Sequence, residues 1–154
     1  MKRDLAFERT YPHPIERVWE AITNSAAIGE WLMSNDFKPE VGHRFQFRAK
    51  PQPGWNGIVD CEVLSCNPPR ELSYSWKGGP LDTLLSIRLQ PVEGGTHLRL
   101  EHNGFRGLAA TMVAKLMSSG WGGMLEKRLP AVLDKLRDGV PLSAPGECLT
   151  DQAK

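Results

Sequence analysis

Histidine and glutamate are the residues of this chain whose types and spacing could hold a metal ion. His97 and His102 lie close together in the sequence, with Glu93 and Glu101 near them. Apolar and polar residues alternate along this stretch, which is typical of a β-strand, and the side chains of a strand point in turn to its two faces. The two imidazoles are therefore expected on opposite faces, whereas a metal site needs ligands that converge on one point. We predict neither a bound metal nor a cofactor.

His102 is the polar residue of greatest interest, because it shares strand parity with Leu98 and Leu100 and is expected to face inward. One interpretation is a polar anchor that orients a ligand in an otherwise apolar cavity. The alternative is a core histidine hydrogen-bonded to the backbone, since buried polar groups find local partners. A catalytic role would need an inward acid–base pair, and the sequence offers only His102 with Tyr74 and no inward carboxylate.

The candidate nucleophiles carry weaker signals, and no catalytic residue is assigned. Ser118 and Ser119 lack the Gly-x-Ser-x-Gly elbow of serine hydrolases. Cys61 lies on an expected inward apolar face, where burial would raise the pKa of its thiol. Its odd separation from Cys66 places the two on opposite faces of a strand, so no disulfide is expected between them. The odd number of cysteines, 3, and the lack of a Cys-x-x-Cys pair indicate free thiols and a cytoplasmic location.

Aromatic side chains form the set most suited to bind a ligand. The chain has 5 tryptophans, and glycines at 120, 122 and 123 remove side-chain volume beside Trp121. We interpret these residues as a cavity wall; the alternatives are plain core packing and glycines that let a helix approach a sheet closely. The predicted ligand-binding residues are Trp31, Phe45, Phe47, Tyr74, Trp76, His102, Met117, Trp121 and Leu125.

Strands and helices must position these side chains. Residues 3–10 alternate as a first strand, and two short helices are expected after Pro14, the second capped by Ser25. From Val41 to His102 five further strands alternate, which indicates an antiparallel sheet with one solvated face. Residues 108–136 then follow a helical period, and Pro130 is expected to kink that helix or start a new turn. The prediction is an α+β fold with a curved six-stranded sheet around a long C-terminal helix.

Length and charge limit the functions open to this chain. Its 154 residues suit one domain, which we place at residues 1–138 with a loose tail at 139–154. A formal charge of +1 argues against a nucleic-acid partner. The sequence has no run of 18 apolar residues, so no membrane span is predicted, and its basic start lacks the apolar segment of a secretory signal.

Six segments, taken in order, resemble the SRPBCC superfamily, which includes the START and Bet v 1-like proteins. They are Pro14–Thr23, Trp31, Val41–Phe47, Val63–Trp76, Gly95–His102 and Gly120–Leu125. More narrowly they resemble the branch related to the C-terminal domain of the activator of the Hsp90 ATPase. The resemblance implies the helix-grip fold, with a deep apolar cavity between the sheet and the C-terminal helix.

Three functional hypotheses follow from this resemblance and from the inward aromatic set. The first is a non-catalytic protein that binds a small hydrophobic molecule in the cavity. The second is a protein-interaction module, linked to chaperones and the stress response by analogy with the family. The third is an enzyme of the cyclase or hydrolase type that uses the same cavity. An exposed sheet edge could also support a homodimer.

Overall fold

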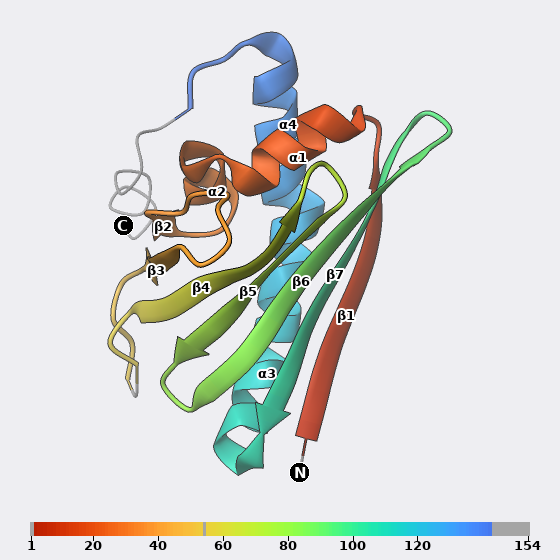
Figure 1. Ribbon diagram of the computed structural model, residues 1–154. Coiled ribbons are helices and arrows are strands. Elements are labelled where there is room, and N and C mark those ends of the chain that lie inside the picture. The colour runs from red at the N-terminus through yellow and green to blue at the C-terminus, as the bar shows by residue number, and fades with distance from the viewer. Residues whose placement is uncertain (1, 54, 143–154) are drawn as a thin grey trace.

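The computed structural model describes residues 2–53 and 55–142, and Figure 1 shows their arrangement. The chain begins with β1 (Lys2–Tyr11), α1 (Ile15–Thr23) and α2 (Ser25–Trp31). The strands that follow are β2 (Ser34–Asn35), β3 (Arg44–Arg48), β4 (Ile58–Asn67), β5 (Glu71–Gly78), β6 (Leu81–Val92) and β7 (Gly95–Arg106). The helical segment that ends the described chain consists of α3 (Gly107–Gly123), a π-helical turn η1 (Met124–Arg128) and α4 (Leu129–Asp138).

All strands form one antiparallel sheet in the order β1-β7-β6-β5-β4-β3-β2. The α+β prediction is confirmed, but the sheet has 7 strands and not six. The additional strand, β2, pairs Ser34 with Arg48 and Asn35 with Phe47 at the sheet edge. Two residues are too few to show an alternating pattern. What holds them in place is the Asn35 side chain, whose Nδ2 donates to the carbonyls of Ser25 and Met33.

The start of α2 also differs from the prediction. Asn24 is the N-cap, and its Oδ1 accepts a hydrogen bond from the Ala27 N–H at 3.1 Å. Ser25 is instead the first helical residue, and its hydroxyl bonds to Asn35 Oδ1 at 2.8 Å. Both side chains suit a cap, so tertiary contact with β2 decides which one takes that place.

The sheet has one buried face, against which α3 lies in contact with β1 and β7 (Figure 1). Strand residues of one parity are buried there, as the alternation predicts. These residues are Phe45, Phe47, Val59, Cys61, Val63, Leu72, Tyr74, Trp76, Leu85, Ile87, Leu89, Leu98, Leu100 and His102. The helices α1 and α2 pack against α4 and close one end of the core.

The long helix changes its hydrogen-bond pattern at η1. The Leu129 N–H donates to the carbonyl of Met124, five residues back, and the next residue, Pro130, has no N–H. The Leu125 carbonyl is therefore left without a donor from within the helix. The hydroxyl of Tyr11, at the end of β1, donates to it at 2.7 Å. The expectation that Pro130 starts a new turn is confirmed, because α4 begins beside it.

The described chain ends soon after α4. Gly139 closes that helix in the left-handed conformation, with φ 70°. Leu142 packs partly buried against the core. The rest of the predicted tail, including Cys148, lies outside the described residues. Within the described ranges, no helix has both the length and the apolar character needed to cross a bilayer.

Candidate ligand-binding site

An apolar pocket of about 230 Å³ lies between the end of α2, strand β5 and the junction of α3 with η1. Its accessible surface is almost entirely apolar. The lining residues are Leu32, Met33, Trp76, Leu116, Met117, Gly120, Trp121 and Met124. Three of them are methionines, whose flexible thioether chains adapt to an irregular guest.

Buried tryptophans form the inner wall of this pocket. The rings of Trp76 and Trp121 lie 5.8 Å apart at an angle of 57°. Trp31 packs on the far side of Trp121, with 6.4 Å between ring centroids, and its indole N–H donates to the Ala21 carbonyl at 2.9 Å. Tilted aromatic pairs at this spacing are favourable, so the wall is fixed by packing from behind.

The glycines of α3 face open space and not the sheet. A Cβ atom built on Gly120, Gly122 or Gly123 would meet no heavy atom within 4 Å beyond the helix's own backbone. The interpretation that these glycines allow a close approach of helix to sheet is therefore wrong. Gly120 lines the pocket, so the missing side chain there leaves room for a guest.

His102 lies behind the pocket wall in a complete hydrogen-bond chain. The Thr83 hydroxyl donates to the Trp76 carbonyl at 2.8 Å, so its oxygen accepts from the Nε2–H of His102, 2.7 Å away. The other ring nitrogen, Nδ1, accepts from the indole N–H of Trp121 at 3.2 Å. This pattern fixes the neutral tautomer with its proton on Nε2.

Burial reinforces the neutral state of this imidazole. Loss of hydration lowers the pKa of His102 to about 3, from an ordinary value of 6.5. Both ring nitrogens are bonded within the protein, so neither is free to orient a ligand or to transfer a proton. The core-histidine alternative thus describes the structure better, although the partners are side chains and not backbone. Burial also raises the pKa of Tyr74, the other member of the acid–base pair considered above.

The pocket includes some of the predicted site residues and omits others. Trp76, Met117 and Trp121 line it. Phe45, Phe47 and Tyr74 pack against one another in the core, in a cluster that Phe37 completes through an edge contact with Phe45 and a tilted contact with Tyr74. The predicted site residues that are buried outside the lining are Trp31, Phe45, Phe47, Tyr74, His102 and Leu125.

The predicted ligand-binding residues omit Leu32, Met33, Leu116 and Met124, and Gly120 was interpreted only as side-chain volume removed at the cavity wall. Leu116 lies within the predicted helical period and is 76% exposed. Gly120 gave the clearest indication of a site in the sequence, because a glycine in a helix interior lowers the stability of the helix. Met33 lies after the end of α2, in a loop that no periodic pattern describes.

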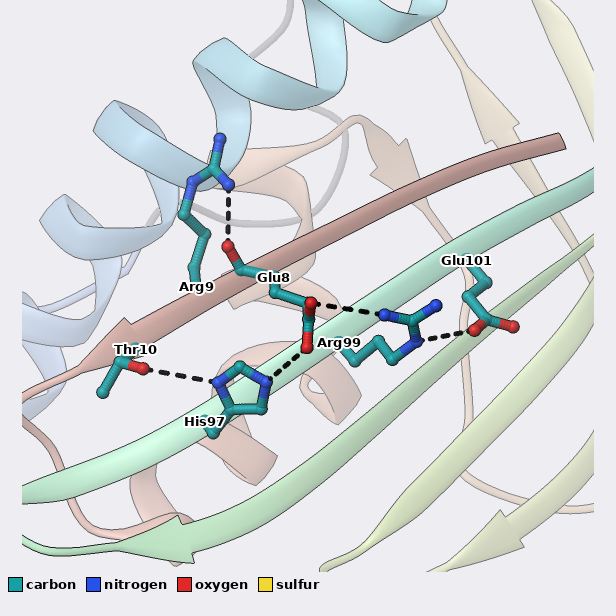
Figure 2. Close-up of polar contacts among 6 residues, drawn as sticks. All are labelled: Glu8, Arg9, Thr10, His97, Arg99 and Glu101. Carbon is teal, nitrogen blue, oxygen red and sulfur yellow. Dashed lines mark hydrogen bonds and ion pairs between the residues drawn. The ribbon is translucent and has the colours of Figure 1, made fainter.

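The outer face of the sheet carries polar hollows of a different kind. Two open grooves of about 600 and 520 Å³ lie there, both lined mainly by charged and polar side chains. In the second, Glu8 of β1 bonds to His97 at 3.0 Å and pairs with Arg99 at 3.4 Å (Figure 2). Arg99 in turn bonds to Glu101 at 2.7 Å. Acids and bases are therefore paired with one another across the strands, and these pairs engage much of the charge on this face.

Among the described residues, no three His, Cys, Asp or Glu side chains gather where they could hold a metal ion. His97 and His102 do lie on opposite faces of β7, the first half-buried in the outer groove and the second fully buried. Cys61 and Cys66 are both free, and burial raises the pKa of each thiol. The apolar pocket is therefore the site that these residues support best.

A sheet that holds a long C-terminal helix against one face, with an apolar pocket between them, defines a helix-grip protein of the SRPBCC superfamily. Residues 12–134 match the family model described as Activator of Hsp90 ATPase homolog 1-like protein. The chain belongs to this family.

Solved structures agree with this assignment. The crystal structure of a Mesorhizobium loti protein is 40% identical, with a TM-score of 0.79 over 86% of this chain and 98% of that one. A Bacillus halodurans protein solved in solution is 28% identical, with a TM-score of 0.72 over 86% and 99% of the two chains. The Aha1 dimer from Colwellia psychrerythraea is 19% identical, with a TM-score of 0.70 over 90% and 99%. No curated protein matches the chain.

Proposed function

We propose that this protein binds a small, uncharged, apolar molecule in the pocket beneath α3, without catalysing a reaction on it. The observation that carries the proposal is the apolar lining of Trp76, Trp121 and three methionines around about 230 Å³. A cavity of about 150 Å³ in a protein core holds a benzene molecule. The pocket therefore has room for a guest of one or two aromatic rings, or an aliphatic molecule of similar volume.

The hydrogen bonds behind the wall support an uncharged ligand. The indole N–H of Trp121 is taken by His102, and the carbonyl of Trp76 is taken by Thr83. The wall thus presents ring carbon atoms to the pocket. A carboxylate placed there would lose its hydration without gaining a donor, which is strongly unfavourable.

The absence of catalysis is supported by the same contacts. An enzyme of the cyclase or hydrolase type would need a group that moves a proton at the ligand. His102 has both nitrogens engaged and stays neutral, and burial raises the pKa of Tyr74. Neither side chain lines the pocket.

A fluorescence titration tests the proposal, because two tryptophans form the wall. We expect naphthalene to quench the tryptophan emission saturably, and the carboxylate analogue 2-naphthoate to bind about tenfold more weakly or worse. Gly120→Leu should abolish naphthalene binding, because its side chain would enter the open space at the pocket.

Gly123→Leu is the matched control for that variant. Gly123 lies in the same helix over open space but does not line the pocket. Both substitutions replace a helical glycine and should raise stability by up to about 1 kcal/mol, so lost binding would not reflect unfolding. Equal binding by the wild type and Gly120→Leu would refute the pocket as the site.

A protein-interaction role is the second candidate, supported by the family description and by the relative that is reported as a dimer. We propose that any such partner is met in the cytoplasm, where the free thiols Cys61 and Cys66 would stay reduced. Light scattering on the purified chain and an ATPase assay with Hsp90 test this role. A monomer without effect on that ATPase would leave the pocket as the functional feature.

A further inference from the structure

An apolar stripe on the outer side of α3 is left uncovered by the rest of the described chain. Leu108, Met112 and Leu116 repeat every four residues, which places them along one side of the helix. Their exposed fractions are 67%, 61% and 76%. We call these three residues the α3 stripe. Scattered exposed leucines are ordinary, but an aligned row of them marks an interaction surface.

The composition of α3 also favours an interaction surface on its outer side. A helix on a protein surface normally carries charged residues on its solvent side. Here Lys115 is the one charged residue in the 17 residues of Gly107–Gly123. The helix is therefore apolar on the side that packs on the sheet and on much of the side that faces away from it.

The charges around the α3 stripe are mostly positive. From residue 106 to residue 128 the chain has four exposed cations, which are Arg106, Lys115, Lys127 and Arg128. The single carboxylate in this range is Glu126, and Arg9 pairs with it at 2.7 Å. An apolar row on a helical segment with an excess of cations matches a surface that offers both acyl chains and negative headgroups.

This charge pattern separates the candidate occupants of the stripe. A second copy would bring four more cations to the contact and no unpaired carboxylate from this segment to offset them. A nucleic acid would meet the cations but would gain nothing from three uncharged apolar side chains. We propose that the α3 stripe docks on the surface of an anionic lipid bilayer, with its side chains among the acyl chains and the four cations against lipid phosphates.

Docking would place the ligand pocket at the bilayer surface. Leu116 belongs both to the α3 stripe and to the pocket lining. If the ligand proposal above holds, an apolar guest could then pass between membrane and pocket without crossing water. The docking itself does not depend on that proposal, since Leu108 and Met112 lie outside the pocket lining.

Vesicle sedimentation tests the docking. We would mix the purified full chain with vesicles of equal parts phosphatidylglycerol and phosphatidylcholine, and with vesicles of phosphatidylcholine alone. We expect the protein to sediment with the anionic vesicles only, and to be released as salt is raised. The double variant Leu108→Ser with Met112→Ser should reduce the partition coefficient by about tenfold or more.

Two further variants keep this test decisive. Lys127→Glu with Arg128→Glu should weaken binding by about tenfold through charge alone. Val41→Ser with Leu84→Ser removes two exposed apolar side chains away from α3 and should bind like the wild type. Circular dichroism and melting temperature verify that each variant is folded.

Three outcomes would overturn the docking. The first is a wild-type chain that stays in the supernatant with anionic vesicles. The second is a stripe variant that binds like the wild type. The third is a dimer in vesicle-free solution that the stripe variant converts to monomer, which would assign the stripe to a second copy. Naphthalene titration of the same stripe variant reports on the pocket separately.

Discussion

At the scale of single residues, His102 shows how a polar group is accommodated in an apolar core. Its two ring nitrogens are bonded to Thr83 and Trp121, side chains from β6 and α3. This arrangement removes the cost of an unpaired buried group, which is about 1–3 kcal/mol. It also holds the Trp121 indole at a fixed angle in the pocket wall. The histidine therefore supports the site without touching a ligand.

The buried imidazole makes stability depend on pH in a defined direction. The pKa of His102 is lowered in the folded chain to about 3, so between pH 6.5 and that value the unfolded chain binds a proton that the folded chain does not. The free energy of unfolding should then fall with decreasing pH, by up to about 1.4 kcal/mol per pH unit. Above pH 6.5 this group adds no pH dependence.

Urea denaturation across this range, on the wild type and His102→Gln, measures the effect. The variant should show a shallower decline of stability with acid. His13, whose pKa is also lowered by burial, titrates in both proteins and cancels in the comparison. Parallel declines would show that His102 is not the residue responsible.

Sequence parity was sufficient to place His102 inside but not to assign its partners. The inward direction followed from its neighbours Leu98 and Leu100 on the same strand face, and the structure confirms it. The partners could not be derived, because Thr83 and Trp121 are each 19 residues away and reach His102 only through folding. A hydroxyl on the buried face of β6 was the one available hint.

At the scale of elements, the π-helical turn η1 depends both on a residue of the helix itself, Pro130, and on a hydrogen bond from β1. Pro130 withholds one N–H from the helix, and the Tyr11 hydroxyl supplies a donor to Leu125 in its place. The contact joins the end of β1 to the middle of the long helical segment. It also fixes the helix directly after Met124, the last lining residue of the pocket.

Removing this hydroxyl should have a measurable cost. Tyr11→Phe leaves the buried Leu125 carbonyl without a donor, and we expect the free energy of unfolding to drop by about 1–3 kcal/mol. Pro130→Ala restores an N–H that can serve the same carbonyl. In that background Tyr11→Phe should therefore cost less, and a double-mutant cycle by urea denaturation measures the difference. Additive effects would contradict this explanation of the turn.

Element type was predictable here wherever a long period was present. The alternation of residues from Phe45 to His102 was enough to predict the strands that hold the core. The periodicity of residues 108–136 likewise predicted a helix, but not its π-helical turn, because only the structure shows that a tyrosine of another element donates to the Leu125 carbonyl. The two-residue β2 had no period to detect.

At the scale of the whole molecule, the pocket depends on the spacing between helix and sheet. Its lining joins residues at the end of α2, on β5 and at the junction of α3 with η1, and Gly120 adds open space beside them. Sequence could predict that aromatic rings gather inside, since strand parity determines their face. It could not predict which rings border a void, because that depends on how far one element stands from another.

The labelling rate of the Cys61 thiol reports on how the whole core opens. Its thiol is buried among strand residues, and burial raises its pKa. In a variant with Cys66→Ser and Cys148→Ser, native labelling by a thiol reagent should be slow and should accelerate in parallel with global unfolding by urea. Rapid labelling in the native state would show that the sheet opens locally at β4.

The pairing of the first strand of the chain with the last has a practical consequence for work on this protein. Lys2 pairs with Arg106, so the amino end of β1 lies beside the first turn of α3 (Figure 1). A purification tag fused ahead of β1 would project next to Leu108. A polyhistidine leader there would add its own affinity for acidic phospholipids, so material for binding measurements should be cleaved or tagged elsewhere.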